Sequence, residues 1–175
     1  NRLAAWFTQR GFTPFPFQQT VWQAMLEGRS GLLHASTGAG KTLAAWGGVL
    51  RRAQAHDEAA GRLSSGLRAL WITPMRALAA DTLLSLQAPL PEVLPGWRAS
   101  LRTGDTPSSE RARQERAWPQ ALVTTPESLS LMLASADLVA TGSSAPAGEA
   151  QQSLADLQLQ CQQLLEQLRV RAGWL

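Results

Sequence analysis

The chain has 175 residues, of which 45% are hydrophobic, 16 are basic and 13 are acidic, and these proportions exclude a disordered or fibrous protein and fit one globular domain. No apolar run reaches the roughly 18 residues that cross a bilayer, and the N-terminus shows no signal-peptide pattern. The single cysteine, Cys161, excludes an internal disulfide framework or a cysteine-rich zinc site, so we expect a cytoplasmic protein without a membrane partner.

The first clear pattern along the chain is helical. Apolar residues recur at helical spacing between residues 17 and 26, and Gly28 supplies a stop. Residues 31–35 then form a short apolar run that predicts a strand, and a glycine-rich turn leads into a helix that begins near Leu43. Residues 51–66 are polar and dotted with glycine and serine, which predicts that this helix ends in a loop.

Three more strands are predicted downstream, in the apolar runs 67–73, 97–102 and 121–125. Pro74 and Pro126 open helices after the first and last of these runs. Thr106 and Pro107 supply an N-cap and a first helical residue for a charged helix that stops at Pro119. Strands that alternate with helices predict an α/β fold, in which a parallel sheet is covered by helices on both faces.

The composition changes after Ala136, which predicts a domain over residues 1–136. Residues 137–150 are small and polar, as is typical of a linker. Residues 151–175 predict a glutamine- and leucine-rich helix with a heptad-like stripe of Leu154, Leu157, Cys161, Leu164 and Leu168. The stripe fits a coiled coil or a helix that binds a protein partner, and it fits equally a helix that packs on its own domain.

Residues 35–42 read A-S-T-G-A-G-K-T and fit the phosphate-loop pattern, with Ala35 in place of the first glycine. Gly38 and Gly40 allow backbone N–H groups to approach phosphate oxygens. Lys41 is suited to reach the β- and γ-phosphates, and the Thr42 hydroxyl to ligate Mg²⁺. The motif therefore predicts a nucleotide site with Lys41 as its catalytic residue, formed by Ser36, Thr37, Gly38, Ala39, Gly40, Lys41 and Thr42.

Two features bear on which nucleotide binds. Lys41 is the only lysine, which argues against a guanine-specific GTPase, because such proteins read the base with a second lysine in an N/T-K-x-D motif. Gln18 follows a Phe-Pro-Phe cluster, and its amide could donate to and accept from the edge of adenine. Alternatively, Gln18 is simply a surface glutamine on a helix.

Two predicted strands end alike, in W-I-T-P at residues 71–74 and V-T-T-P at residues 123–126. Both following helices would begin at the carboxyl edge of the sheet, beside the phosphate loop. These helix ends, with Arg76 and Arg102, could hold a nucleic-acid backbone, although helix capping alone explains either junction. The arginine-rich composition suits phosphate recognition too, but a coding bias toward alanine and arginine accounts for it as well.

Here the sequence resembles a known family. S-T-G-A-G-K-T, T-P-M-R-A-L, R-T-G-D-T and T-T-P-E-S-L resemble motifs I, Ia, Ic and Ib of superfamily 2 DExH-box helicases, and F-P-F-Q resembles their adenine-reading Q-motif. The pattern, which spans residues 6–134, is similar to the large helicase-related (Lhr-like) group, including its bacterial ligase-associated DNA-repair members. The resemblance implies the first part of a RecA-like lobe with a phosphate-loop NTPase fold, which uses ATP and Mg²⁺.

The resemblance also implies roles for individual residues. It implies adenine contact by Gln18 and triphosphate binding by residues 36–42. It further implies contacts with single-stranded or partly duplex DNA, and these would come from Pro74, Arg76, Thr103, Gly104, Thr125, Pro126 and Glu127. The preference for DNA rests on the resemblance alone.

The sequence departs from the family pattern after the T-T-P-E-S-L motif. A helicase lobe would continue into an apolar strand that ends in Asp-Glu-x-His, whereas the one Asp-Glu pair here, Asp57-Glu58, lies in a polar segment before the second predicted strand. A second lobe with its arginine finger is also missing. We therefore expect an incomplete sheet of marginal stability, and a chain that alone neither hydrolyses ATP appreciably nor unwinds duplexes. The tail is either a native product or the result of a frameshift, deletion or fusion.

Three functions are open at this point. The first is the ATP- and strand-binding front portion of an ATP-dependent DNA-repair helicase. The second is a noncatalytic ATP- or DNA-binding module whose terminal helix recruits a partner. The third is a small phosphate-loop kinase with residues 111–116 as an arginine-rich lid, which leaves both Thr-Pro junctions and the Gln18 cluster unexplained.

Overall fold

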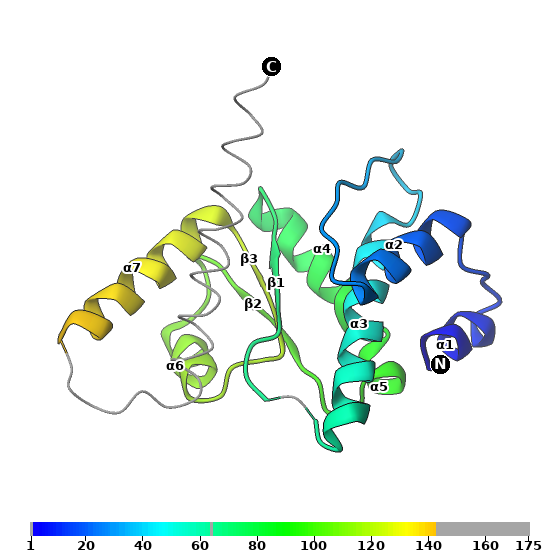
Figure 1. The fold of residues 1–175 in the computed structure, drawn as a ribbon. Helices are drawn as coiled ribbons and strands as arrows, with labels where there is room; N and C mark the ends of the chain where they lie inside the picture. Colours follow the sequence, from blue (N-terminus) through cyan, green and yellow to red (C-terminus); the bar gives the residue numbers. More distant parts are fainter. Residues whose placement is uncertain (1, 64, 143–175) are drawn as a thin grey trace.

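Three parallel strands form the centre of the fold (Figure 1). The computed structural model describes residues 2–63 and 65–142, with side chains described as far as residue 134. In chain order its elements are α1 (Arg2–Gln9), α2 (Pro16–Leu26), α3 (Lys41–Ala60), β1 (Ala69–Ile72), α4 (Arg76–Gln87), α5 (Leu90–Val93), β2 (Ala99–Arg102), α6 (Ser108–Arg116), β3 (Ala121–Thr124) and α7 (Pro126–Gly142).

The strands lie in the order β1-β3-β2, with β3 in the middle. Ala121 in β3 is level with Ala69 in β1 and with Ala99 in β2, so the three strands run in register and end together. Helices α1 to α5 lie on one side of the sheet, and α6 and α7 lie on the other (Figure 1). The predicted α/β fold, a parallel sheet flanked by helices, is therefore confirmed.

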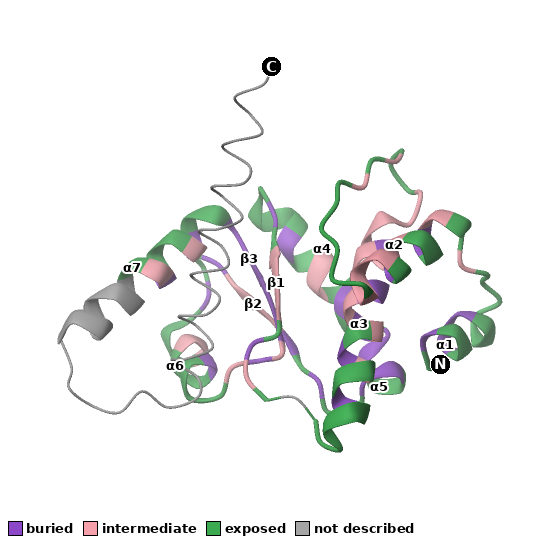
Figure 2. Cartoon of the chain, viewed as in Figure 1, coloured by how far each residue is buried: buried purple, intermediate pink, exposed green. Residues whose placement is uncertain are grey.

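The two faces of the sheet carry cores of very different size (Figure 2). Side chains of β3 alternate between them, because successive residues of a strand point to opposite faces. Ala121 and Val123 join a large cluster that includes buried residues from all of α1 to α5, whereas Leu122 packs with Leu67 and Met132 on the other face. Most of the apolar burial that stabilises the described fold is thus on the side of α1 to α5.

Residues 31–35 are not a strand, contrary to the sequence prediction. A strand forms when its backbone N–H and C=O groups pair with a neighbour, and the described sheet consists of β1, β3 and β2 alone. Leu32 is 96% exposed in this segment. An apolar run is therefore a poor guide here, because the segment lacks a strand to pair with among the described residues.

The helix after the phosphate loop is much longer than the sequence predicts. Residues 51–60 continue α3 instead of forming a loop, and α3 ends at Ala60, followed by the C-cap Gly61, which has a left-handed backbone with φ of 62°. The segment contains four alanines and two arginines, which are good helix formers. It also buries Ala53 against the large core, next to Leu50, so tertiary packing supports the extension.

Two predicted helix starts are wrong. Helix α4 begins at Arg76 instead of Pro74, and the Thr73 hydroxyl donates to the Met75 carbonyl instead of capping the helix. Helix α6 begins at Ser108, after Pro107 as its N-cap, because the Thr106 hydroxyl accepts a hydrogen bond from Thr103 N. This helix also ends at Arg116, before the predicted stop at Pro119.

The third predicted start is confirmed. Helix α7 begins at Pro126, and the Thr125 hydroxyl accepts a long hydrogen bond of 3.5 Å from Ser128 N. This helix extends to Gly142, past the boundary predicted at Ala136. The rest of the predicted linker and the predicted helix over 151–175 lie outside the described residues. Among the described helices, none has the length and apolar character to cross a membrane.

The structure contains two helices, α1 and α5, that the sequence pattern does not predict. Helix α1 adds Leu3, Trp6 and Phe7 to the large core. The proline-rich stretch before β2 contains the short helix α5, and Glu92 of this helix pairs with Arg10 at 2.8 Å. Both elements extend the core on the side of the phosphate-loop helix.

Candidate functional site

The phosphate loop is built at the start of α3. Gly40 is the N-cap of this helix and has φ of 81°, a left-handed conformation that residues with a Cβ rarely adopt. Helix α3 therefore begins at Lys41, as the motif requires, and its N-terminus faces the loop. The Lys41 ammonium donates to the carbonyl oxygens of Ala35 at 2.6 Å and Ser36 at 2.7 Å, which holds the loop curled over the lysine.

The loop fits a triphosphate in its accessibility and in its charge. Ser36, Thr37 and Gly38 are exposed, and Lys41 and Thr42 are half-buried. Residues 31–42 contain no acidic side chain, so no carboxylate within the loop competes for Lys41 or for the helix N-terminus. The loop itself therefore supplies no negative side chain that would repel an anion.

Gln18 lies against the loop and is only 2% exposed. Its Oε1 accepts a hydrogen bond from Phe15 N at 2.9 Å, and its Nε2 donates to the Gly40 carbonyl at 3.1 Å. The side chain thus bridges the Phe-Pro-Phe segment and the phosphate loop, and it is not a surface glutamine. Contact with adenine remains a prediction, because both the oxygen and the nitrogen of the Gln18 side-chain amide form hydrogen bonds with the backbone here.

Helix packing sets the position of Gln18. Helix α2 packs closely along α3, and the Trp22 indole donates to the Leu43 carbonyl at 3.2 Å. The two helices are thus tied together beside the loop, and the Gln18 side chain contacts Gly40 directly.

A second candidate site lies at the carboxyl ends of the three strands. Threonines mark these ends: Thr73 after β1, Thr103 after β2, and Thr124 and Thr125 at the end of β3; all four are buried. Thr73 N donates to the Thr124 carbonyl at 2.9 Å, and the Thr124 hydroxyl donates to the Arg102 carbonyl at 2.6 Å. Backbone and hydroxyl groups thus tie the three ends together, and the Thr-Pro junctions lie side by side with Pro74 and Pro126 exposed.

Arg76, the first residue of α4, reaches across this edge to the R-T-G-D-T turn. Its Nη1 lies 2.9 and 3.0 Å from the two carboxylate oxygens of Asp105. Its Nη2 lies so close to Gly104 that a Cβ added there would be 2.9 Å away. The Arg76 side chain therefore packs against the turn. The predicted contact residues Arg76, Thr103 and Gly104 thus lie close together.

Glu127 occupies the first turn of α7 at the same edge. Hydrogen bonding from its own backbone N–H lowers the pKa of this carboxyl below its usual value, as do the Thr125 hydroxyl and the nearby Arg76. The α7 N-terminus, predicted to receive a phosphate, is thus adjacent to a carboxylate of the chain itself.

Arg102 lies apart from this group. Its side chain is 13% exposed, and it pairs with Glu115 of α6 at 2.7 Å. The guanidinium also lies over the Trp118 ring, 5.5 Å from the ring centroid. The sequence prediction that Arg76 and Arg102 act together at the edge is therefore not supported by their positions, because the Arg102 side chain packs against α6.

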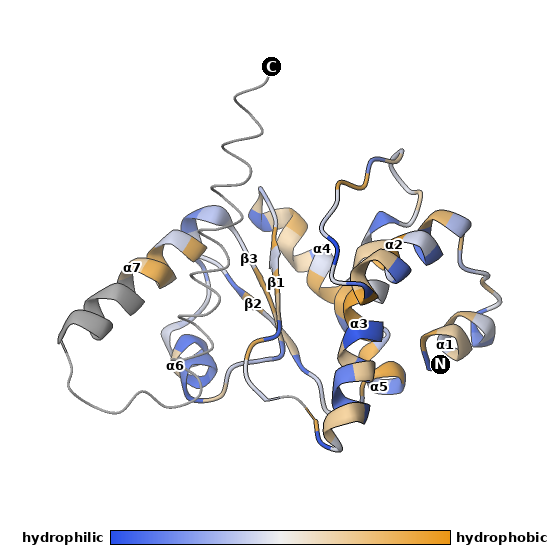
Figure 3. Ribbon diagram, in the orientation of Figure 1, coloured by the Kyte–Doolittle hydropathy of each residue, from blue (hydrophilic) through white to orange (hydrophobic). Residues whose placement is uncertain are grey.

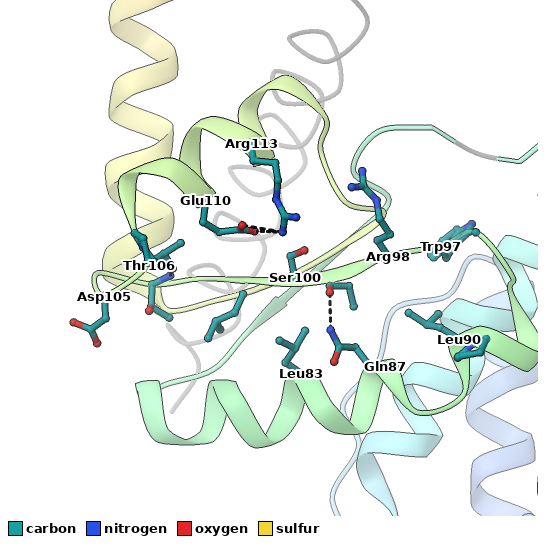
Figure 4. A pocket seen from close by; sticks show the side chains of 16 residues that line it. Leu83, Gln87, Leu90, Trp97, Arg98, Ser100, Asp105, Thr106, Glu110 and Arg113 are labelled. Carbon is teal, nitrogen blue, oxygen red and sulfur yellow. Dashed lines mark hydrogen bonds and ion pairs between the residues drawn. The ribbon is translucent and has the colours of Figure 1, made fainter.

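A groove of about 840 Å³ runs from the R-T-G-D-T turn along the outer edge of β2, between α4 and α6 (Figure 4). Gln87 of α4 donates to the Ala99 carbonyl at 3.0 Å, and Gln114 of α6 donates to the Leu101 carbonyl at 3.0 Å. Gln114 is the one buried residue of an otherwise strongly hydrophilic helix (Figure 3). These two amides form hydrogen bonds with carbonyls on the outer edge of β2, which would otherwise be free to pair with another strand.

The sequence motifs do not single out these glutamines, nor Asp105 as the partner of Arg76. Asp105 stands within the R-T-G-D-T motif, so its place at the site is visible in the sequence but its contact with Arg76 is not. The Asp57-Glu58 pair lies inside α3, where the Trp97 indole donates to Asp57 at 3.3 Å. In the part of the chain that the structure describes, no group of three or more His, Cys, Asp or Glu residues is placed to hold a metal ion.

The chain is similar in sequence to known helicases. The family model described as DEAD/DEAH box helicase matches residues 15–170. The Lhr helicase/probable uracil glycosylase of Mycolicibacterium smegmatis is 38% identical over 141 residues, which are 75% of this chain and 9% of that protein. The ATP-dependent helicase Lhr-Core of Saccharolobus solfataricus is 34% identical over 140 residues, covering 76% of this chain and 16% of that protein. The chain thus spans a small part of these relatives.

Solved structures agree with the sequence matches. The structure of Mycobacterium smegmatis helicase Lhr bound to ssDNA and AMP-PNP is similar with a TM-score of 0.61 and 32% identity, over 78% of this chain and 18% of that chain. The DUF1998 helicase MrfA bound to DNA is similar with a TM-score of 0.61 and 26% identity, over 74% of this chain and 16% of that chain. Both are helicases that contain a far longer chain than the one described here.

Proposed function

The chain belongs to the DEAD/DEAH box helicase family, and on that premise we propose that it is the ATP- and strand-binding front portion of an Lhr-like, ATP-dependent DNA helicase. The observation that carries this proposal is the phosphate loop. Residues 35–40 curl over Lys41 at the start of α3, and the loop itself contributes no acidic side chain. In this arrangement a loop N–H, a helix N-terminus and an ammonium group all favour a triphosphate.

Within this proposal, each residue of the loop has a role. Lys41 would neutralise the β- and γ-phosphates, and the Thr42 hydroxyl would hold Mg²⁺, which supplies positive charge to the phosphoryl group being transferred. Gln18 would favour adenine, and its bridge between Phe15 and Gly40 would link base recognition to the loop. The use of ATP is supported by the relatives named as ATP-dependent helicases.

The second candidate site would bind the nucleic-acid strand. Its exposed residues Pro74, Arg76, Gly104, Pro126 and Glu127 lie at the carboxyl edge of the sheet, where open α/β sheets bind ligands. Both similar helicase structures named above contain DNA, which supports DNA as the partner. We place the parent enzyme in DNA repair and in the cytoplasm, as the sequence resemblance and the lone cysteine suggest.

This stretch of the chain would bind nucleotide without turning it over. The 175 residues contain no Asp-Glu-x-His segment to position the metal and the attacking water, and phosphoryl transfer depends on that positioning for most of its acceleration. Helicase activity would then belong to a longer assembly that supplies this segment and the second lobe.

Titration of a fluorescent ATP analogue in the presence of Mg²⁺ tests the proposal. Lys41→Ala should weaken binding about 10- to 100-fold, which is the size of a hydrogen bond to a charged group. Arg52→Ala is the matched control, because it removes one positive charge from an exposed position on the same helix and should leave binding unchanged. Equal affinities for the wild-type chain and for Lys41→Ala would contradict the nucleotide site, and ATP turnover that depends on Lys41 would contradict the inactivity of this stretch.

A further inference from the structure

We propose that Asp105 is a built-in competitor for nucleic-acid phosphate at Arg76, so that this carboxylate limits the affinity of the strand site. This inference rests on the proposed strand-binding function and concerns how that same site is tuned. It starts from the ion pair at the carboxyl edge of the sheet, in which Arg76 Nη1 contacts both carboxylate oxygens of Asp105 at 2.9 and 3.0 Å.

The geometry of this contact is that of an anion seated on an arginine. A carboxylate and a phosphate offer a guanidinium the same kind of acceptor, two oxygens with negative charge. The pair is also solvent-accessible, with side-chain exposures of 62% for Arg76 and 72% for Asp105. A phosphate approaching Arg76 from solvent would therefore meet a position that Asp105 already occupies.

Asp105 is held in place by the turn that carries it. Arg111 of α6 donates to the Gly104 carbonyl at 2.7 Å and to the Thr106 carbonyl at 2.8 Å. Thr103 N donates to the Thr106 hydroxyl at 2.9 Å, and Thr106 N donates to the Thr103 carbonyl at 3.1 Å. These hydrogen bonds fix the backbone on both sides of Asp105, so an ordered turn presents the carboxylate to Arg76.

Gly104 allows Arg76 to rest beside the turn. A Cβ at this position would lie 2.9 Å from Arg76 Nη2 and 3.3 Å from its Cζ, and Gly104 has no left-handed backbone that would itself require glycine. An alanine at this position would therefore push Arg76 away from the turn at little cost to the backbone. Gly104→Ala and Asp105→Asn thus weaken the same ion pair by independent routes.

Fluorescence anisotropy with labelled oligo-dT measures the effect. Asp105→Asn should bind about two- to fivefold more tightly than the wild-type chain, which corresponds to the loss of one exposed ion pair. Glu58→Gln is the control, because it removes one negative charge at the far end of α3 and should change affinity little. Circular dichroism checks that each variant is folded.

A double-mutant cycle separates competition at Arg76 from a general loss of negative charge. In an Arg76→Ala background, Asp105→Asn should give no gain in affinity, because the cation for which it competes has been removed. An equal gain in both backgrounds would overturn the inference, as would an Asp105→Asn variant that binds no more tightly than the wild-type chain.

The same experiment distinguishes this inference from the proposed function. If the wild-type chain binds oligo-dT and Arg76→Ala weakens binding while Asp105→Asn leaves it unchanged, the strand site stands and the competition does not. If neither the wild-type chain nor Asp105→Asn binds oligo-dT, both are overturned.

Discussion

The two candidate sites hold their positive groups in opposite ways. In the phosphate loop, the Lys41 ammonium donates to two backbone carbonyls, and residues 31–42 include no acidic side chain. At the strand edge, Arg76 is paired with Asp105, and the α7 N-terminus is adjacent to Glu127. The loop therefore holds its cation with neutral backbone groups, whereas the strand edge pairs its cation with a carboxylate of the chain.

This difference shows what a motif does and does not specify. Both sites are found in the sequence by residues that suit phosphate, but pairing within the fold decides how strongly each one attracts it. Exposed ion pairs contribute only about 0.2–1 kcal/mol, so the carboxylates at the strand edge weaken binding without preventing it. We expect the strand edge to be a weaker and more adjustable site than the loop.

Of the changes at the two sites, a substitution of Gly40 should have the largest effect. Gly40 has a left-handed backbone, and an added Cβ would lie 2.8 Å from the Gln18 amide nitrogen. Gly40→Ala should lower the free energy of unfolding by roughly 1–3 kcal/mol and weaken ATP binding, because the loop must leave its conformation. The measurement is urea unfolding together with the fluorescent ATP titration.

Gly104→Ala is the matched substitution at the strand edge. Its added Cβ meets the end of the flexible Arg76 side chain, which can move away. It should change the free energy of unfolding by less than about 0.5 kcal/mol and should leave ATP binding unchanged. A similar loss of stability in both variants would remove the distinction between a rigid loop and an adjustable edge.

Lowering the pH should reduce the free energy of unfolding through Glu127, by less than Gly40→Ala does. The folded pKa of Glu127 is lowered, so its contribution to stability is present above the unfolded pKa and is lost as the pH falls through the folded value. Because Glu92 and Glu110 have lowered pKa values as well, the wild-type profile alone does not isolate Glu127. Glu127→Gln should flatten the decline in stability below about pH 4.5, as measured by urea unfolding across pH. An unchanged profile would show that Glu127 is not engaged at the edge.

The phosphate loop is predictable from the sequence because its information is local. Eight consecutive residues supply the glycines, the lysine and the hydroxyl, and the helix start at Lys41 follows from them. The parallel sheet is predictable for a similar reason, since strand and helix patterns alternate along the chain. The structure confirms the helix after the loop and the parallel sheet, whereas nucleotide binding by the loop stays a prediction.

Other features depend on contacts between distant residues and were not predictable. Residues 31–35 are apolar enough for a strand, but pairing requires a neighbouring strand that the described sheet does not supply. Arg102 ends β2 at the predicted edge, yet its side chain turns to Glu115 and Trp118 of a later segment. The polar segment 51–60 is helical because one side of it packs on the large core. The contact between Arg76 and Asp105 likewise joins residues 29 positions apart.

Hydrogen–deuterium exchange, followed by mass spectrometry, tests whether the phosphate loop binds ATP and the sheet edge binds a DNA strand. The exchange is measured with ATP and Mg²⁺ or with oligo-dT. With ATP, backbone amides of residues 36–43 should exchange more slowly, while residues 103–107 should change little. Oligo-dT should slow exchange around residues 74–76, 103–107 and 125–127 and leave the loop almost unaffected. ATP that leaves residues 36–43 unprotected would contradict the phosphate loop as the nucleotide site, and with it the function proposed for this chain.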